Sequence, residues 1–271
     1  MRLVIRGLII LIVGYLVVER WDGFVPTDTG YRMAALDAPV QAGRFEETDR
    51  NDLYVPYKGN PDYIVPDDVA NAAIAHKSGG RRWYSYHPTT TLQKQAVVFL
   101  FHGAGRTGLS MIDMWRDVAD QNGIILIALH GHGKNWPSEG VSPTILHEIL
   151  SELGESARLD MERVYLFGHS NGGGYTQSLI NQSAGPWRAA AIHAGYADPA
   201  AAIIPQVPKP IRFYLGTRDH IFLTKSARYV ARALSEKGHA VDLHLIPSHS
   251  HWFYDAGPVI ATDAWEWFSR Q

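Results

Sequence analysis

A serine set among glycines is the first candidate for chemistry in this sequence. Ser170 ends an apolar run and stands at the centre of GHSNG (168–172), which fits the pattern G-x-S-x-G. A strand is expected before this motif and a helix after it, so the chain must turn sharply at the serine. Such a turn leaves no room for side chains two residues before and two residues after it. We therefore predict that Ser170 is a nucleophile on a strained turn, rather than an incidental serine of a glycine-rich loop.

A serine hydroxyl needs a base and an orienting acid to react near neutral pH. Asp219 follows one apolar run, and His249 and His251 follow the next. The carboxyl ends of parallel strands meet at one edge of a sheet, so these side chains are expected near Ser170. We predict Asp219 as the acid and His251 as the base, because the loop before His251 gives it more reach. His249 is the alternative base.

Other carboxylates and histidines are less well placed for these roles. Asp198 follows the preceding strand, whereas Asp242 begins a strand and is therefore expected at the opposite edge of the sheet. His244 lies within a predicted strand. His220 adjoins the predicted acid in sequence, and so cannot easily be oriented by it.

Two backbone amides are placed to bind a developing negative charge, as an oxyanion requires. The N–H of Asn171 follows the serine at the start of the expected helix, whose N-terminus favours negative charge. HGAG (102–105) follows an apolar run, and its first glycine lets the chain turn so that the N–H of Ala104 faces inward. We predict Asn171 and Ala104 as the donors. The alternative for HGAG is a glycine-rich turn without a catalytic role.

The elements that must position these residues follow from hydrophobic periodicity. Short apolar runs predict strands at 81–88, 96–103, 124–129, 163–168, 189–194, 211–216 and 241–246. Helical spacing predicts helices at 108–123, 142–156, 171–183, 223–238 and 259–270. Strands that are apolar throughout need cover on both faces of their sheet. The sequence therefore predicts an α/β fold, with a doubly wound, mostly parallel sheet of roughly six to eight strands flanked by helices.

The N-terminus has the pattern of an export signal. Arg2 precedes an apolar stretch and Arg6 interrupts it, and an uncharged run follows at 7–18. As a helix this run spans about 18 Å, which is shorter than the roughly 30 Å hydrocarbon core of a membrane. No small-residue cleavage site follows this run. We predict residues 1–20 to be a signal sequence or a membrane anchor, the alternative being a buried helix. The protein is then exported to the periplasm or the exterior, with membrane association through residues 3–18 if the segment is retained.

The segment 21–80 is predicted to be an extended arm or linker, because its prolines and polar residues break any periodicity. Tyr54, Tyr57 and Tyr63 nevertheless indicate that it lies on a surface, since aromatic side chains seek contact. The catalytic domain is then expected to span 81–271.

Composition narrows the chemistry further. The 25 basic and 27 acidic residues give a net charge of -2, so no nucleic-acid partner is expected. The absence of cysteine excludes disulfides, thiolate metal ligands and cysteine nucleophiles. HGH (130–132), DH (219–220) and HSH (249–251) are histidine-rich strand ends without an established zinc spacing, so a metal-dependent hydrolase is a remote alternative. We expect no metal and no other cofactor. A non-catalytic binding protein on the same scaffold is the alternative outside enzymes.

Four segments together resemble the α/β-hydrolase superfamily, and the resemblance extends over residues 80–271. They are FLFHGAGRTG, YLFGHSNGGG, GTRDHIF and SHSHWFYD. Within the superfamily, the sequence is most similar to the branch of secreted esterases that contains polyhydroxybutyrate depolymerases, feruloyl esterases and acetylxylan esterases. The resemblance implies acyl transfer from a small or polymeric carboxylic ester to Ser170. A serine peptidase or a lipase on the same fold is the alternative.

The resemblance also bears on the base and on the substrate. His251 followed by Trp252 is similar to the histidine–tryptophan ends of related esterases, which favours His251 over His249. Trp136, Tyr175 and Trp252 are expected to form an aromatic wall for acyl or aryl groups. Their alternative is a role in packing.

Overall fold

The computed structural model describes residues 42–59, 62–90, 94–131, 135–136, 142–154 and 158–271. The chain divides into two units, Met1–Pro39 and Val40–Gln271, and the elements described below belong to the second. The predicted signal or anchor at 1–20 lies outside the described residues, as does the part of the predicted arm up to residue 41. No helix in the described part of the chain is long and apolar enough to cross a membrane.

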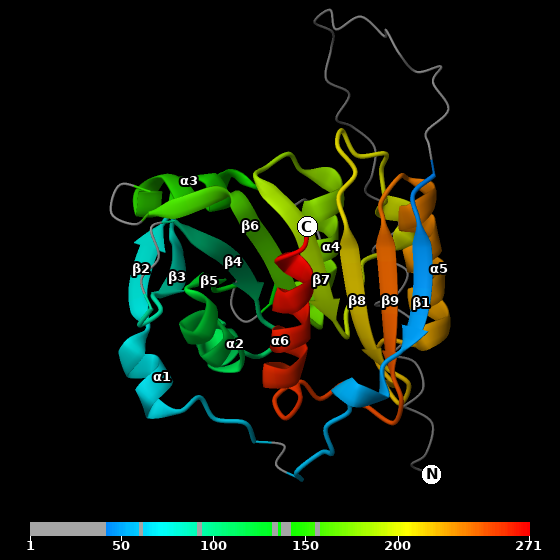
Figure 1. The fold of residues 1–271 in the computed structure, drawn as a ribbon, viewed down its shortest axis with the longest axis horizontal. Coiled ribbons are helices and arrows are strands. Elements are labelled where there is room, and N and C mark those ends of the chain that lie inside the picture. Colours follow the sequence, from blue (N-terminus) through cyan, green and yellow to red (C-terminus); the bar gives the residue numbers. More distant parts are fainter. Residues whose placement is uncertain (1–41, 60–61, 91–93, 132–134, 137–141, 155–157) are drawn as a thin grey trace, which may run out of the picture. The chain divides into compact units, whose positions relative to one another are not determined.

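A nine-stranded sheet forms the centre of the second unit, in the order β1-β9-β8-β7-β6-β4-β5-β3-β2 (Figure 1). Its strands are β1 (Phe45–Asp49), β2 (Ile74–Ser78), β3 (Arg81–Tyr86), β4 (Gln95–Phe101), β5 (Ile125–Leu129), β6 (Leu159–His169), β7 (Trp187–His193), β8 (Ile211–Gly216) and β9 (Val241–Ile246). β3 runs antiparallel to both of its neighbours, and the pairs from β5 through to β1 are parallel. The predicted mostly parallel sheet is confirmed, with more strands than expected.

Helices cover both faces of this sheet, as apolar strands require. They are α1 (Asp67–Ala72), α2 (Gly108–Asn122), α3 (Thr144–Gly154), α4 (Asn171–Gln182), α5 (Thr224–Glu236) and α6 (Gly257–Phe268), with short 3₁₀ turns η1 (Asn51–Leu53) and η2 (Pro199–Ala201). In β4, Val97 and Phe99 belong to the core with α3, α4 and α5, whereas Val98 and Leu100 belong to the core with α1, α2 and α6. Alternate side chains along a strand such as β4 therefore point into two separate hydrophobic cores, one on each face of the sheet.

Two segments of the predicted arm, β1 and β2, belong to the sheet. β1 pairs with β9 at one edge, and β2 pairs with β3 at the other. Between these edges, the described residues 50–59 and 62–66 lie along the carboxyl ends of the parallel strands (Figure 1). The predicted domain start at residue 81 is therefore wrong. β1 has the sequence FEETD and is largely exposed, so it offered no apolar run to identify it.

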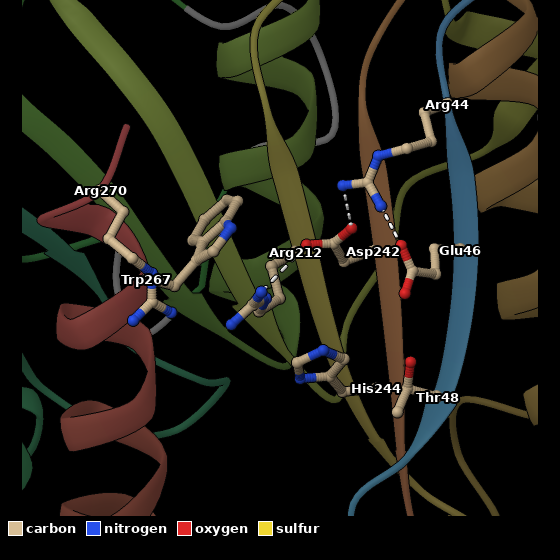
Figure 2. A pocket seen from close by; sticks show the side chains of 8 residues that line it. All are labelled: Arg44, Glu46, Thr48, Arg212, Asp242, His244, Trp267 and Arg270. Carbon is tan, nitrogen blue, oxygen red and sulfur yellow. Dashed lines mark hydrogen bonds and ion pairs between the residues drawn. The ribbon is translucent and has the colours of Figure 1, made fainter.

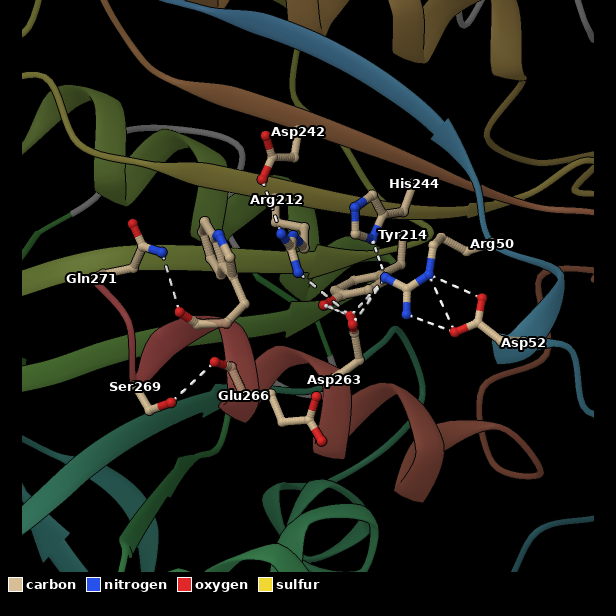
Figure 3. Close-up of polar contacts among 11 residues, drawn as sticks. Arg50, Asp52, Arg212, Tyr214, Asp242, His244, Asp263, Glu266, Ser269 and Gln271 are labelled. Atoms are coloured by element: carbon tan, nitrogen blue, oxygen red, sulfur yellow. Dashed lines mark hydrogen bonds and ion pairs between the residues drawn. The ribbon is translucent and has the colours of Figure 1, made fainter.

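A cluster of alternating charges joins β8, β9 and α6 to the residue that follows β1 (Figure 3). Asp263 accepts hydrogen bonds from Arg50 at 3.0 Å, from Arg212 at 3.4 Å and from the hydroxyl of Tyr214 at 3.2 Å. Arg212 also donates to Asp242 at 3.0 Å. The buried Arg212 guanidinium is thereby held between two carboxylates, which offsets the cost of removing its charge from water.

A polar cavity of about 280 Å³ adjoins this cluster (Figure 2). It is lined by Arg44, Glu46, Thr48, Arg212, Asp242, His244, Trp267 and Arg270. Burial and the nearby Arg212 lower the pKa of His244 to about 4, so this imidazole is neutral at neutral pH. Asp242 and His244 lie within β9 rather than beyond its end, in agreement with their rejection as catalytic residues.

We expect Asp263→Ala to lower the free energy of unfolding by about 3 kcal/mol, because it leaves buried Arg212 short of a carboxylate and the Tyr214 hydroxyl without an acceptor. Urea denaturation followed by circular dichroism measures this change. Glu266→Ala removes an exposed carboxylate from the same helix and is the matched control, with little effect. Equal stability of the two variants would contradict a structural role for the cluster.

Candidate active site

Ser170 occupies a strained turn between β6 and α4. Its backbone angles are φ 54° and ψ -122°, a region that residues with side chains rarely adopt. A Cβ atom at Gly168 would overlap the hydroxyl of Thr176, and one at Gly172 would overlap the carbonyl oxygen of Phe101. The predicted sharp turn is confirmed, together with the requirement for glycine on both sides of the serine. The turn presents the Ser170 hydroxyl at the carboxyl edge of the sheet.

The side chains of Ser170, His251 and Asp219 form one hydrogen-bonded line. His251 Nε2 lies 2.9 Å from Ser170 Oγ, and His251 Nδ1 lies 2.8 Å from Asp219 Oδ2. The histidine side chain is 19% exposed and the aspartate side chain is 0% exposed. The base position is therefore reachable from solvent, whereas the acid is enclosed behind it.

The Asp219 carboxylate is held by its own loop. Its Oδ1 atom accepts hydrogen bonds from the backbone N–H groups of Ile221 at 2.8 Å and Phe222 at 2.9 Å. Burial alone would raise the pKa of Asp219, but the hydrogen bonds from His251, Phe222 and Ile221 outweigh burial and keep the pKa below its usual value. An ionised Asp219 accepts the Nδ1–H of His251, which leaves Nε2 free to accept the serine proton.

Asp219→Asn is expected to reduce kcat for ester hydrolysis about 10⁴-fold. The amide can donate to Nδ1 of His251, which moves the imidazole proton to Nε2 and removes the acceptor that faces Ser170. Steady-state hydrolysis of p-nitrophenyl acetate measures the loss. Asp198→Asn is the control, because exposed Asp198 caps η2 and is expected to leave the rate unchanged. A small loss from Asp219→Asn would assign the acid role elsewhere.

The rejected candidates lie away from this line. Asp198 accepts a hydrogen bond from the N–H of Ala200 within η2, and His220 is exposed. His249, the alternative base, is buried, and its Nε2 atom lies 3.0 Å from Nε2 of His193 rather than near Ser170. Among the described residues, no group of three or more His, Cys, Asp and Glu side chains could hold a metal ion.

The two predicted amide donors lie next to the serine. Asn171 is the first residue of α4, so its N–H has no acceptor within the helix. A Cβ atom on Gly103 would lie 3.3 Å from Ser170 Cβ, which places the 102–105 loop directly beside the nucleophile. In the described part of the chain, neither the Ala104 nor the Asn171 N–H is given to another group. Both amides are thus available to an anion that forms at Ser170.

His102 fixes the loop that carries Ala104. Its Nε2 atom accepts the N–H of Gly131 at 3.0 Å, so the ring proton is on Nδ1, which donates to the carbonyl oxygen of Gly103 at 2.8 Å. Burial lowers the pKa of His102 to about 4, and the ring is therefore neutral at neutral pH. The sequence alone predicts no role for His102, although a histidine directly after a buried strand is a recognisable signal.

Trp136 and Tyr175 are packing residues, which corrects the prediction that they form an aromatic wall. They are 4% and 5% exposed, and their rings lie 4.8 Å apart in the core. The Trp136 indole donates to the carbonyl oxygen of His102, and the Trp136 backbone N–H donates to the side chain of Asn171, both at 2.7 Å. Trp136 therefore stabilises the backbone at His102 and the side chain of Asn171 instead of facing a substrate.

Trp252 is partly exposed and contacts the segment that crosses the strand ends. Its ring lies 5.9 Å from that of Tyr57 and 5.6 Å from the Arg106 guanidinium, which also donates to the carbonyl oxygen of Tyr63 at 2.9 Å. A cavity of about 230 Å³ opens here and is lined by Tyr54, Val55, Tyr57, Arg218, Ser248, His249, Ser250, Trp252 and Asp255. The tyrosines of the crossing segment therefore lie on a surface, as predicted, and that surface adjoins the His251 loop.

The strand order, the strained serine turn and the Ser–Asp–His order define the chain as an α/β-hydrolase. A model of the dienelactone hydrolase family matches residues 130–266, about half of the chain. The chain belongs to this family. The matched region contains Ser170, Asp219 and His251, and ends before the last residues of α6.

Solved structures share the fold at low sequence identity. The apo form of esterase 2 from Thermogutta terrifontis is 13% identical with a TM-score of 0.60, over 73% of this chain and 94% of that chain. Its butyrate-bound form gives 13% and 0.57 over the same shares. A thermostable esterase is 20% identical with a TM-score of 0.58, over 75% of this chain and 64% of that chain. The comparison with curated proteins gave no match.

Proposed function

We propose that this hydrolase is a serine esterase that cleaves carboxylic esters through an acyl-enzyme. The observation that carries the proposal is the hydrogen-bonded line from Ser170 Oγ through His251 to Asp219, at 2.9 and 2.8 Å. Membership of the dienelactone hydrolase family and the esterases among the structural neighbours support the same class of reaction.

In the first half of the reaction, Ser170 Oγ attacks the ester carbonyl carbon while His251 Nε2 takes the hydroxyl proton. The carbonyl oxygen becomes an oxyanion, and the N–H groups of Ala104 and Asn171 bind it, assisted by the N-terminus of α4. The tetrahedral intermediate then collapses. Its carbon–oxygen bond to the alcohol breaks, and His251 donates its proton to the leaving alcohol.

In the second half, a water molecule replaces the alcohol. His251 Nε2 takes a proton from this water as its oxygen attacks the acyl carbon, and the same two amides bind the second oxyanion. The bond to Ser170 Oγ breaks and His251 returns the proton to the serine, which releases the carboxylic acid. Ionised Asp219 stabilises the imidazolium that forms in both halves.

The substrate is proposed to be a small or polymeric carboxylic ester, as in the polyhydroxybutyrate depolymerase, feruloyl esterase and acetylxylan esterase branch. The cavity of about 230 Å³ between Tyr57 and Trp252 has room for an aryl or short acyl group next to the His251 loop. Export, with or without membrane anchoring through residues 3–18, is proposed from the N-terminal sequence pattern.

The proposal is tested on the purified full-length protein with p-nitrophenyl esters of graded acyl length, methyl ferulate and hydroxybutyrate oligomers. Hydrolysis is expected to survive a chelator and to be lost after treatment with p-nitrophenyl diethyl phosphate, which reacts with activated serines. Activity that is lost to the chelator would favour a metal-dependent hydrolase. Faster cleavage of peptide p-nitroanilides than of any ester would favour a peptidase.

A further inference from the structure

Three buried histidines form a second hydrogen-bonded line beneath the active site. His169 Nδ1 lies 2.9 Å from His193 Nδ1, and His193 Nε2 lies 3.0 Å from His249 Nε2. The three residues are 5%, 0% and 4% exposed. His169 ends β6 immediately before Ser170, His193 ends β7, and His249 stands in the loop that carries His251. We call this set the histidine chain.

The three rings of the histidine chain are neutral at neutral pH. Burial lowers the pKa values of His169 and His193 well below the usual range, and lowers the pKa of His249 to about 4. A neutral imidazole has one N–H, and each bond between two rings requires one. His193 must therefore donate through one nitrogen and accept through the other, so the chain has a direction.

We propose that the histidine chain has a positioning role: it holds His251, the proposed base, at hydrogen-bond distance from Ser170. His249 and His251 share one loop, and that loop is also bonded to the acid loop, because Arg218 N–H donates to the His249 carbonyl oxygen at 2.9 Å. Among the described residues, two hydrogen bonds join the loop that carries His249 and His251 to β6, β7 and Ser170. They are His251–Ser170, which must break and re-form during the reaction, and His249–His193, which does not. The His249–His193 hydrogen bond therefore holds this loop throughout the reaction.

The side chains that pack around the histidine chain hold its rings, and so the His249–His193 hydrogen bond, in place. Phe253 is fully buried, and its ring lies 4.8 Å from that of His169 and 4.9 Å from that of His193. Ring–ring hydrogen bonds that are shielded from water are stronger than exposed ones. His251 in turn lies 5.3 Å from the His169 ring and stacks on Phe222 at 5.7 Å. A small shift of the His249 side chain therefore moves the loop that sets the distance from His251 to Ser170.

The geometry favours this positioning role of the histidine chain over a role as a proton relay. A proton that entered at one end of the histidine chain, with another leaving at the other end, would reverse both hydrogen bonds. The chain could accept a second proton only after all three rings had rotated or the first proton had returned. Phe253 packs against two of these rings, which opposes rotation.

The test rests on the proposed esterase activity and uses a pair of substitutions at His193. His193→Gln retains an amide near the position of Nε2 that can donate to His249, whereas His193→Asn retains only a group near Nδ1 that can face His169. We expect His193→Asn to lower kcat for p-nitrophenyl acetate about 10- to 100-fold with KM unchanged. His193→Gln should recover most of the loss. The rate of inactivation by p-nitrophenyl diethyl phosphate should fall in parallel with kcat.

The matched control is His239→Gln, at another fully buried histidine, which is bonded to Lys209 and Asn181 away from the triad. It should lower the melting temperature and leave kcat unchanged. All rates are measured well below the melting temperature of each variant. If His193→Asn does not fold, His249→Gln and His249→Leu replace the pair, with the Gln variant again expected to be the faster.

Equal kcat values for folded His193→Asn and wild type, or equal losses in the Asn and Gln variants, would overturn the positioning role. Failure of the proposed function gives a different result, because Ser170→Ala would then retain the wild-type rate. The two failures can therefore be told apart within one set of measurements.

Discussion

Ser170→Ala is expected to lower kcat for p-nitrophenyl acetate about 10⁶-fold. The alanine has no Oγ atom, so no acyl-enzyme can form, and His251 Nε2 loses the hydroxyl that it faces at 2.9 Å. Alanine is preferred to glycine because it preserves the strain of the turn at φ 54° and therefore tests the hydroxyl alone. Steady-state kinetics at saturating ester measures the change.

The control for this substitution is Ser178→Ala. Ser178 lies on α4, the helix that follows Ser170, and its hydroxyl donates to the carbonyl oxygen of Gly174 at 3.1 Å. Its removal should leave kcat unchanged. If Ser170→Ala kept a rate near that of the wild type while remaining folded, the nucleophile and the mechanism built on it would both be wrong.

The second large effect is expected at the base. His251→Ala should cost about as much as the loss of the nucleophile, roughly 10⁶-fold in kcat, because the members of such a triad act as a unit. His249→Ala should cost only about 10- to 100-fold, since His249 acts by holding the loop rather than by accepting the proton. The ratio of the two kcat values is the measurement. A larger loss in His249→Ala than in His251→Ala would transfer the base role to His249.

Much of the central fold could be predicted because its strands are apolar throughout. The runs that became β4 to β9 are buried on both faces, and each is followed by a turn or a helix with clear periodicity. The edge strands had no such signal. β1 and β2 are largely exposed and polar, so their membership of the sheet depends on pairing with distant strands rather than on local pattern.

The residues proposed to react could also be predicted, because chemistry restricts their types and the topology restricts their places. Ser170, Asp219 and His251 each follow a different strand at one edge, and the structure brings them within hydrogen-bond distance. Trp136 and Tyr175 could not be assigned in this way. An aromatic residue next to a strand end can face a substrate or the core, and both of these face the core.

The histidine chain shows what local pattern cannot supply. His193 closes the apolar run AAAIH, and a polar residue that ends a buried strand is a visible signal. Its partners His169 and His249 are 24 and 56 residues away in sequence, so the pairing depends on strand register and loop path. Such contacts become predictable only once the order of the strands is known.

The central claim is that Ser170 is the nucleophile, and covalent labelling tests it most directly. The full-length protein is treated with p-nitrophenyl diethyl phosphate, digested, and analysed by tandem mass spectrometry, with His251→Ala treated in parallel. We expect one diethylphosphoryl group on Ser170 in the wild type, formed in step with the loss of esterase activity, and little labelling in the variant. Loss of activity with the label on another residue, or full activity with Ser170 fully labelled, would contradict the proposed mechanism.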